Sequence, residues 1–153
     1  MTDIVDARAR SRMMSGIRGK NTKPEILVRR ALFKFGFRFR LHRKDLPGAP
    51  DIVLPKWRVV IFVHGCFWHL HPGCPNARVP ATRTEFWVAK LGANVERDRQ
   101  ALNRLAEAGW RVLVVWECLT RDKGGLAALP ETLSEWIRGS ERSGELCPPD
   151  MNQ

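Results

Sequence analysis

The sequence lacks any apolar stretch long enough to cross a bilayer as a helix, which takes about 20 residues. Its first ten residues, M-T-D-I-V-D-A-R-A-R, contain no apolar signal region. We therefore expect neither a membrane protein nor an exported one, and a cytoplasmic location follows as an expectation. Internal repeats and low-complexity tracts are also absent.

Acidic residues are scarce. The chain has 16 Asp and Glu against 26 Lys and Arg, which gives a formal net charge of +10. Such an excess favours a polyanionic partner, of which nucleic acid is the commonest. The excess is dominated by arginine, whose planar fork fits phosphate, and it accompanies six tryptophans, whose rings can stack on bases. A membrane surface is the rival partner, but no strongly amphipathic basic helix supports it.

Cysteine is also uncommon, and the four residues are Cys66, Cys74, Cys118 and Cys147. In a cytoplasmic chain of 153 residues, metal binding or reactive thiols explain cysteines better than disulfides do. Packing as small hydrophobic side chains is the alternative, and it explains Cys118 well. It does not explain why two cysteines and a histidine crowd into a loop that also contains proline and glycine.

The crowded loop has the spacing C-x4-H-x2-C, formed by Cys66, His71 and Cys74. Cys118 follows another apolar run and can supply a fourth ligand. Three thiolates and one imidazole make a closed tetrahedral site of the structural zinc type. Spacing alone leaves His64 or His69 as alternatives to His71.

The chain is most simply a single domain, long enough to bury a hydrophobic core. We divide it into a basic arm at 1–20, a folded domain at 21–138 and a flexible tail at 139–153. Within the domain, the patterns predict these elements in order: helix 22–35, strands 37–41, 51–54 and 57–63, helix 82–108 with a kink or break near Gly92, strand 110–116 and helix 131–138.

Two of the connections predict how the strands pair. The short turn between 51–54 and 57–63 predicts an antiparallel hairpin. The long helix before 110–116 predicts a crossover to a central strand. The fold class is therefore α/β, with a mixed central sheet of four or five strands flanked by helices.

A second group of polar residues surrounds this hairpin. Asp51 begins one strand, and His64 and His69 come just after its partner strand, so the pairing brings them together. A carboxylate can hold Mg²⁺ against a phosphate while a neutral histidine moves a proton. Glu25, one helix away, could orient a histidine or a water bound to the metal. Two alternatives remain: Glu25 can be only a helix-capping carboxylate, and Asp51 only a turn residue.

The hairpin is also the skeleton of the restriction-endonuclease-like nucleases, but their usual signature is missing. The second strand of those enzymes usually carries an acidic residue, any residue and a lysine. Here the corresponding stretch is Phe62-Val63-His64. A generic nuclease prediction therefore lacks its acid and its lysine.

Four aromatic residues follow the apolar strand or begin the long helix: Phe67, Trp68, Phe86 and Trp87. On a basic protein, exposed rings can be inserted between base pairs, where stacking returns about 1–3 kcal/mol per base. The alternative is a small satellite core that covers the zinc loop.

Five segments resemble the very short patch repair (Vsr) endonucleases. They are L-P-G-A-P-D at 46–51, V-I-F-V-H-G-C-F-W-H at 60–69, V-P-A-T-R-T-E-F-W at 79–87, N-V-E-R-D-R at 94–99 and G-W-R-V-L-V-V-W-E-C at 109–118. The resemblance runs from the basic arm to about residue 138, and these motifs are long and specific.

The resemblance implies a restriction-endonuclease-like fold and a Mg²⁺-dependent enzyme that nicks double-stranded DNA at a T·G mismatch. The cut would fall 5′ of the mismatched thymine and start the repair of deaminated 5-methylcytosine. By position, Asp51 would bind the catalytic magnesium with the backbone carbonyl of Val63, where the family often has threonine. His64 and His69 would act at the scissile phosphate, with His69 as the proton acceptor, and Glu25 would support the site.

The same resemblance implies roles for the cysteines and the aromatic residues. The structural zinc would be held by Cys66, His71, Cys74 and Cys118. The residues that intercalate into the duplex would be Phe67, Trp68, Trp87 and, from the arm, Met14. We expect a monomer that acts at the bacterial nucleoid, with other repair proteins as candidate partners and no membrane association.

Overall fold

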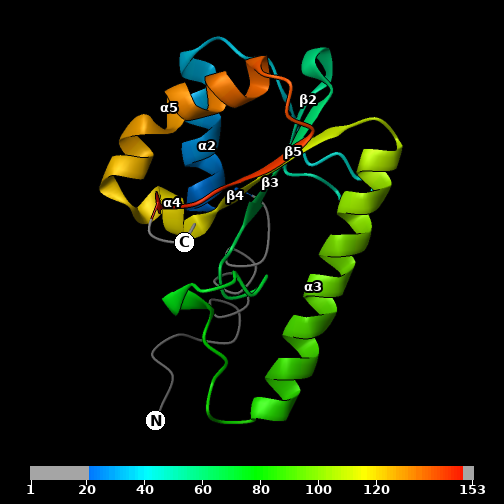
Figure 1. Cartoon of the computed structure of the whole chain (residues 1–153), viewed down its shortest axis with the longest axis vertical. Helices are drawn as coiled ribbons and strands as arrows, with labels where there is room; N and C mark the ends of the chain where they lie inside the picture. Colours follow the sequence, from blue (N-terminus) through cyan, green and yellow to red (C-terminus); the bar gives the residue numbers. More distant parts are fainter. Residues whose placement is uncertain (1–20, 150–153) are drawn as a thin grey trace, which may run out of the picture.

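The computed structural model describes residues 21–149 and contains one five-stranded sheet with helices on both faces (Figure 1). Its elements are α2 (Lys23–Lys34), β1 (Arg40–Leu41), β2 (Ile52–Leu54), a 3-10 helix (Pro55–Trp57), β3 (Val59–His64), a second 3-10 helix (Pro75–Ala77), α3 (Thr84–Glu107), β4 (Arg111–Trp116), α4 (Glu117–Arg121), α5 (Lys123–Arg138) and β5 (Ser143–Leu146). Residues 1–20, which we predicted to be a basic arm with Met14, lie outside the described range.

The strand order is β1-β2-β3-β4-β5. The pairs β1–β2 and β2–β3 are antiparallel, whereas β3–β4 and β4–β5 are parallel. The predicted hairpin, the crossover and the mixed α/β sheet are therefore confirmed. The assignment to the restriction-endonuclease-like fold stays a prediction.

Strand β3 lies at the centre and is buried on both faces, as its uninterrupted apolar run predicted. Because strand side chains alternate, Val59 and Ile61 join one hydrophobic cluster and Val60 and Phe62 join the other. Helices α2, α4 and α5 cover the first face, and α3 lies along the second (Figure 1). Two separate cores thus fix the position of the end of β3, where the polar residues begin.

Helix α3 is a single continuous helix of 24 residues. The predicted break near Gly92 is wrong. A Cβ atom added at Gly92 would meet no other atom within 4 Å. Leu105 anchors the C-terminal half in the core, whereas the N-terminal half extends past the edge of the sheet toward the loop that follows β3 (Figure 1). Among residues 21–149, no helix is both long and apolar enough to span a membrane.

The end of the chain differs from its prediction. Residues 143–146 of the supposed flexible tail form the edge strand β5, which pairs with β4 from Val112 to Val115. The prediction failed because this strand is short and mostly polar, so its sequence S-G-E-L carries no strand pattern. Two further elements were placed imperfectly: strand 37–41 shrinks to Arg40–Leu41, and helix 131–138 is only the second half of α5.

Candidate functional site

An open cleft of about 880 Å³ lies where the end of β3 meets α2, α3 and the turn before β2. The four residues predicted to form the reaction centre all line it: Glu25, Asp51, His64 and His69. Basic side chains of Lys90, Arg97 and Arg121 also line the cleft. The hairpin argument predicted that Asp51, His64 and His69 come together, and they share one cleft with Glu25, which is 44 positions before His69.

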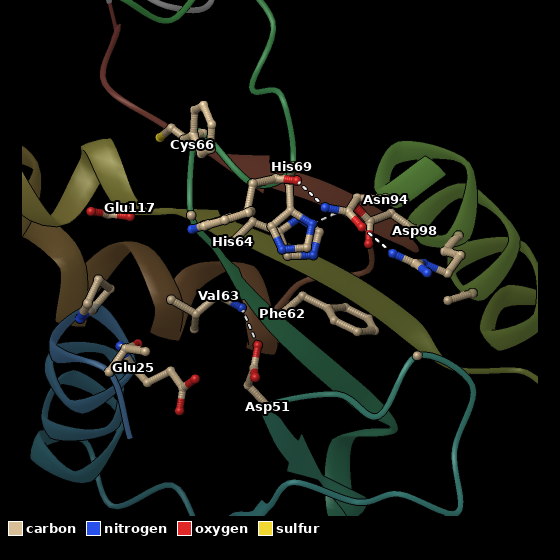
Figure 2. A pocket seen from close by; sticks show the side chains of 18 of the residues that line it. Glu25, Asp51, Phe62, Val63, His64, Cys66, His69, Asn94, Asp98 and Glu117 are labelled. Atoms are coloured by element: carbon tan, nitrogen blue, oxygen red, sulfur yellow. Dashed lines mark hydrogen bonds and ion pairs between the residues drawn. The ribbon is translucent and has the colours of Figure 1, made fainter. Parts of the chain in front are cut away.

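Asp51 is tied to the end of β3. Its Oδ2 atom accepts a hydrogen bond from the backbone N–H of Val63 at 2.7 Å (Figure 2). The N–H and C=O groups of one residue in a strand point to the same side, so the Val63 carbonyl opens toward Asp51 as well. A carboxylate and a carbonyl oxygen thus face a common point, and both are ligand types that Mg²⁺ accepts.

The negative charge of an ionised Asp51 is unfavourable in this cleft unless a cation compensates it. Burial, assisted by the neighbouring Glu25 carboxylate, raises the pKa of Asp51 to about 7, although the Val63 N–H opposes the shift. Two acidic groups within reach of each other, Glu25 buried and Asp51 half-buried, form a site that a divalent cation would neutralise. The donor set in this cleft therefore fits a hard cation with oxygen ligands.

His64 and His69 stack face to face, with ring centroids 3.8 Å apart and planes 3° apart. Burial and the neighbouring His69 lower the pKa of His64 well below its ordinary value, so His64 is neutral. His69 Nδ1 lies 2.6 Å from Asp98 Oδ2, on α3. Because a carboxylate only accepts, Nδ1 carries the hydrogen in a neutral His69, and Nε2 is left as a proton acceptor.

Glu25 caps α2 as the sequence predicted, but it does more. The backbone N–H of Asn21 donates to Glu25 Oε2 at 2.9 Å, and Thr22 Oγ1 accepts from the Glu25 N–H at 3.4 Å. The same Oε2 atom also contacts His42 Nε2 at 3.1 Å and Arg29 Nη2 at 3.0 Å. The capping carboxylate is thus buried inside a polar network beside Asp51.

Sequence reasoning missed two residues of this cleft region, Asp98 and His42. Asp98 lies in a stretch that resembled the family, but nothing in its spacing linked it to His69, 29 residues earlier. A signal for His42 was available: Leu41 pairs with Ile52, so the next residue along, His42, lies opposite Asp51. Its backbone N–H indeed donates to the Asp51 carbonyl at 3.1 Å.

The predicted cysteine and histidine cluster is assembled. One ligand atom each from Cys66, His71, Cys74 and Cys118 lies within 4.8 Å of all the others, which fits a four-ligand metal site. His71 Nδ1 faces the thiols, at 3.7 Å from Cys66 Sγ and 3.4 Å from Cys118 Sγ. The alternative ligands His64 and His69 belong instead to a separate group with Asp98.

The Cys66 and Cys118 thiols keep their protons when no metal compensates their charge. Burial raises the pKa of Cys66 to about 11, and burial together with Cys66 raises the pKa of Cys118. The His71 ring is buried against Trp116, at 4.1 Å and nearly parallel, and burial lowers its pKa. Trp116 Nε1 in turn donates to Glu145 Oε1 at 2.8 Å, so strand β5 supports the cluster.

The aromatic residues form one group between the loop and the first turn of α3. Trp87 is the hub, with ring centroids 5.4 Å from Phe67, 6.0 Å from Trp68 and 5.2 Å from Phe86. Phe86 is 44% exposed, and the other three are partly buried. Asn94 of α3 also donates to the Trp68 backbone carbonyl at 3.0 Å. The rings support one another at the rim of the cleft.

Comparison of the sequence with known proteins identifies the family of this chain. The family model for the DNA mismatch endonuclease Vsr matches residues 2–76. The DNA mismatch endonuclease Vsr of Escherichia coli is 48% identical over 95% of this chain and 94% of its own length. The type II nicking enzymes V.XorIIP of Xanthomonas oryzae and V.NmeAIP of Neisseria meningitidis are 52% and 44% identical, over 84% and 90% of this chain and 93% and 96% of their own lengths. The chain belongs to the Vsr family of DNA mismatch endonucleases.

Proposed function

We propose that this protein is a strand-specific, Mg²⁺-dependent endonuclease that nicks double-stranded DNA at a T·G mismatch, 5′ of the mismatched thymine. The observation that carries the proposal is the cleft itself, in which a half-buried carboxylate, Asp51, lies near the His69–Asp98 pair. The names of the relatives, which include a mismatch endonuclease and nicking enzymes, support the choice of substrate.

Asp51 and the backbone carbonyl of Val63 would hold the catalytic Mg²⁺, with Glu25 behind Asp51. When bound, such an ion neutralises charge that develops on the phosphate and makes a bound water more acidic. The fit rests on the paired acidic groups, whose burial in this cleft is unfavourable unless a cation accompanies them. Val63 contributes only through its backbone, so the absence of the family's frequent threonine does not remove a ligand.

His69 would take the proton from the attacking water. Asp98 fixes the imidazole so that Nε2 is the basic atom, and it stabilises the positive charge that forms on the ring. His64 lies parallel to this ring and is neutral, so it does not repel the charge. It would contact the scissile phosphate as a hydrogen-bond donor.

The four-ligand cluster would hold a structural Zn²⁺. Three thiols and one imidazole complete a tetrahedron and leave no position open for a substrate or a water, which is the pattern of structural rather than catalytic zinc. Its role would be to fix the loop that carries His69 and Trp68. Elemental analysis of the purified protein identifies the ion.

The net charge of +10 supports binding to the DNA backbone, which supplies most of the affinity and makes it sensitive to salt. The basic residues that line the cleft, Lys90, Arg97 and Arg121, would contact phosphates near the cut. We keep the expectations of a monomer in the cytoplasm, with other repair proteins as candidate partners.

A labelled duplex with one T·G pair tests the function. We expect Mg²⁺-dependent cleavage of the thymine strand alone, with its new 3′ end just before the thymine, and little cleavage of the matched T·A duplex. A panel of flanking sequences is needed because the preferred context is unknown. Binding without a nick on any mismatched duplex would favour a non-enzymatic DNA-binding module and contradict the proposal.

Replacement of Trp68 by alanine should weaken mismatch discrimination more than total DNA affinity. Loss of one stacked ring removes about 1–3 kcal/mol, so binding to the T·G duplex should fall about 10-fold or more while matched-duplex binding changes little. Fluorescence anisotropy on both duplexes measures the two affinities. Phe33→Ala is the matched control, because Phe33 is a 78% exposed ring that does not line the cleft. Equal losses of affinity for both duplexes would contradict an intercalating role for Trp68.

A further inference from the structure

His42 lies beside Glu25 and Asp51 and has no assigned role. It follows β1, and its side chain is only 14% exposed. Its imidazole Nε2 is 3.1 Å from Glu25 Oε2, and its backbone N–H donates to the Asp51 carbonyl at 3.1 Å. One residue therefore contacts both Glu25 and Asp51, the first through its ring and the second through its backbone.

The contacts converge on a single oxygen of Glu25. Three groups contact the Glu25 carboxylate at Oε2: the Asn21 N–H, Arg29 Nη2 and His42 Nε2. Since two of these groups are obligate donors, Oε2 acts as the acceptor and His42 Nε2 carries a hydrogen. The carboxylate is directed from α2 toward Asp51 (Figure 2).

The geometry does not favour His42 as a metal ligand. Glu25, His42 and Asp51 lie within 4.8 Å of one another and could in principle surround an ion. However, Arg29 Nη2 is 3.4 Å from His42 Nε2. A cation bound to Nε2 would therefore sit against the Arg29 guanidinium and be repelled. The His42 ring therefore contacts the Glu25 carboxylate and would influence the Mg²⁺ ion only through it.

The backbone at His42 is held in an unusual conformation. Its φ angle is +49°, in the left-handed region, which costs about 1 kcal/mol for a residue with a side chain. Strain of this kind persists where the surrounding contacts determine the conformation, and it clusters at functional sites. Here the conformation presents the ring to α2 and the backbone N–H to Asp51.

We propose that His42 is a positioning residue of the magnesium site, which together with Arg29 holds the Glu25 carboxylate in place beside Asp51. This inference rests on the proposed function. Loss of a group that orients an acidic residue around a metal typically weakens metal binding 10- to 100-fold. The main consequence is therefore on Mg²⁺ affinity and only secondarily on the rate at saturating Mg²⁺.

The test measures nicking of the T·G duplex over a range of Mg²⁺ concentrations. For His42→Ala, we expect the half-saturating Mg²⁺ concentration to rise at least about 10-fold, with the saturated rate within about threefold of wild type. His42→Gln keeps an N–H donor and should restore the half-saturating concentration to within about threefold of wild type. Leu41→Ala is the matched control, since Leu41 is an exposed neighbour on β1 outside the cleft, and it should leave the Mg²⁺ dependence unchanged.

Three results would overturn the proposal: an unchanged Mg²⁺ dependence in His42→Ala, a loss of rate that saturating Mg²⁺ does not restore, or glutamine behaving like alanine. A second measurement, without DNA, separates this proposal from the proposed function. The Mg²⁺-induced rise in melting temperature should need about 10-fold more Mg²⁺ in His42→Ala than in wild type, even if no duplex is nicked. An equal response of both proteins to Mg²⁺ would overturn the role of His42 on its own.

Discussion

Replacing Asp51 with asparagine is expected to abolish nicking and, without divalent cations, to stabilise the protein above neutral pH. Losing a metal ligand removes several kcal/mol of transition-state stabilisation, and each 1.4 kcal/mol or so is a factor of ten, so nicking should fall at least about a thousandfold. The asparagine oxygen can still accept from the Val63 N–H, so the fold should persist.

The direction of the stability change follows from the raised pKa of Asp51, about 7 in the folded protein, against an ordinary value of 3.8. Between these values the folded state holds a proton that the unfolded state has released, so stability falls as pH rises through this window. Above about pH 7, Asp51 is ionised in the folded protein and the full free-energy cost of its charge is present. Asparagine carries no charge and avoids this cost. We expect Asp51→Asn to raise the free energy of unfolding by about 2 to 4 kcal/mol at about pH 8 and by much less at about pH 4.

Urea unfolding in EDTA at both pH values measures the change, and gel assays of the nicked strand measure activity. Asp45→Asn is the matched control, because Asp45 is an exposed carboxylate whose pKa is lowered by its hydrogen bond with Arg43. It should bring no gain in stability. A variant of Asp51 that nicks, or one that is destabilised at the higher pH, would contradict the assignment.

Replacing Cys118 with serine should release the zinc and loosen the loop after β3. Bound zinc should fall from about one ion per chain toward none, because the remaining three ligands no longer close a tetrahedron. The free energy of unfolding should fall by about 3 kcal/mol or more, since structural metal binding contributes directly to folding. Nicking should fall with it, because the loop carries both His69 and Trp68.

Cys147→Ser is a close control for this change. Cys147 is also a partly buried thiol packed against the same hydrophobic cluster, but it is not one of the four residues of the metal site. Emission spectrometry on the dialysed proteins counts the zinc. Retention of zinc by Cys118→Ser, or its loss from Cys147→Ser, would show that the ligand set is wrong.

The sequence predicted the β2–β3 hairpin and most of the polar residues that lie at its end. Strand β3 was visible as an apolar run, and its abrupt end at His64 located the polar residues, because a strand buried on both faces needs an uninterrupted apolar pattern. The loop spacing likewise predicted that Cys66 and Cys74 gather with a histidine, but it left His64 and His69 open as alternatives to His71. These are local patterns that tertiary contacts do not change.

Other features depend on distant contacts that no local pattern carries. Strand β5 is polar and forms only because β4 presents an unpaired edge to it. The helix around Gly92 stays intact because one glycine costs only about 1 kcal/mol, which the rest of a long helix offsets. Asp98 was missed for the same reason, since it acquires its partner His69 only when α3 packs beside the loop that follows β3.

The continuity of α3 has a consequence for where the strand is cut. Trp87 in its first turns belongs to the aromatic group, and Asp98 in its middle holds His69. These residues are 11 positions apart in one unbroken helix, a separation of about 16 Å along its axis. If the aromatic group binds at the mismatch and His69 acts at the scissile bond, this rigid helix fixes the distance between the mismatch and the cut.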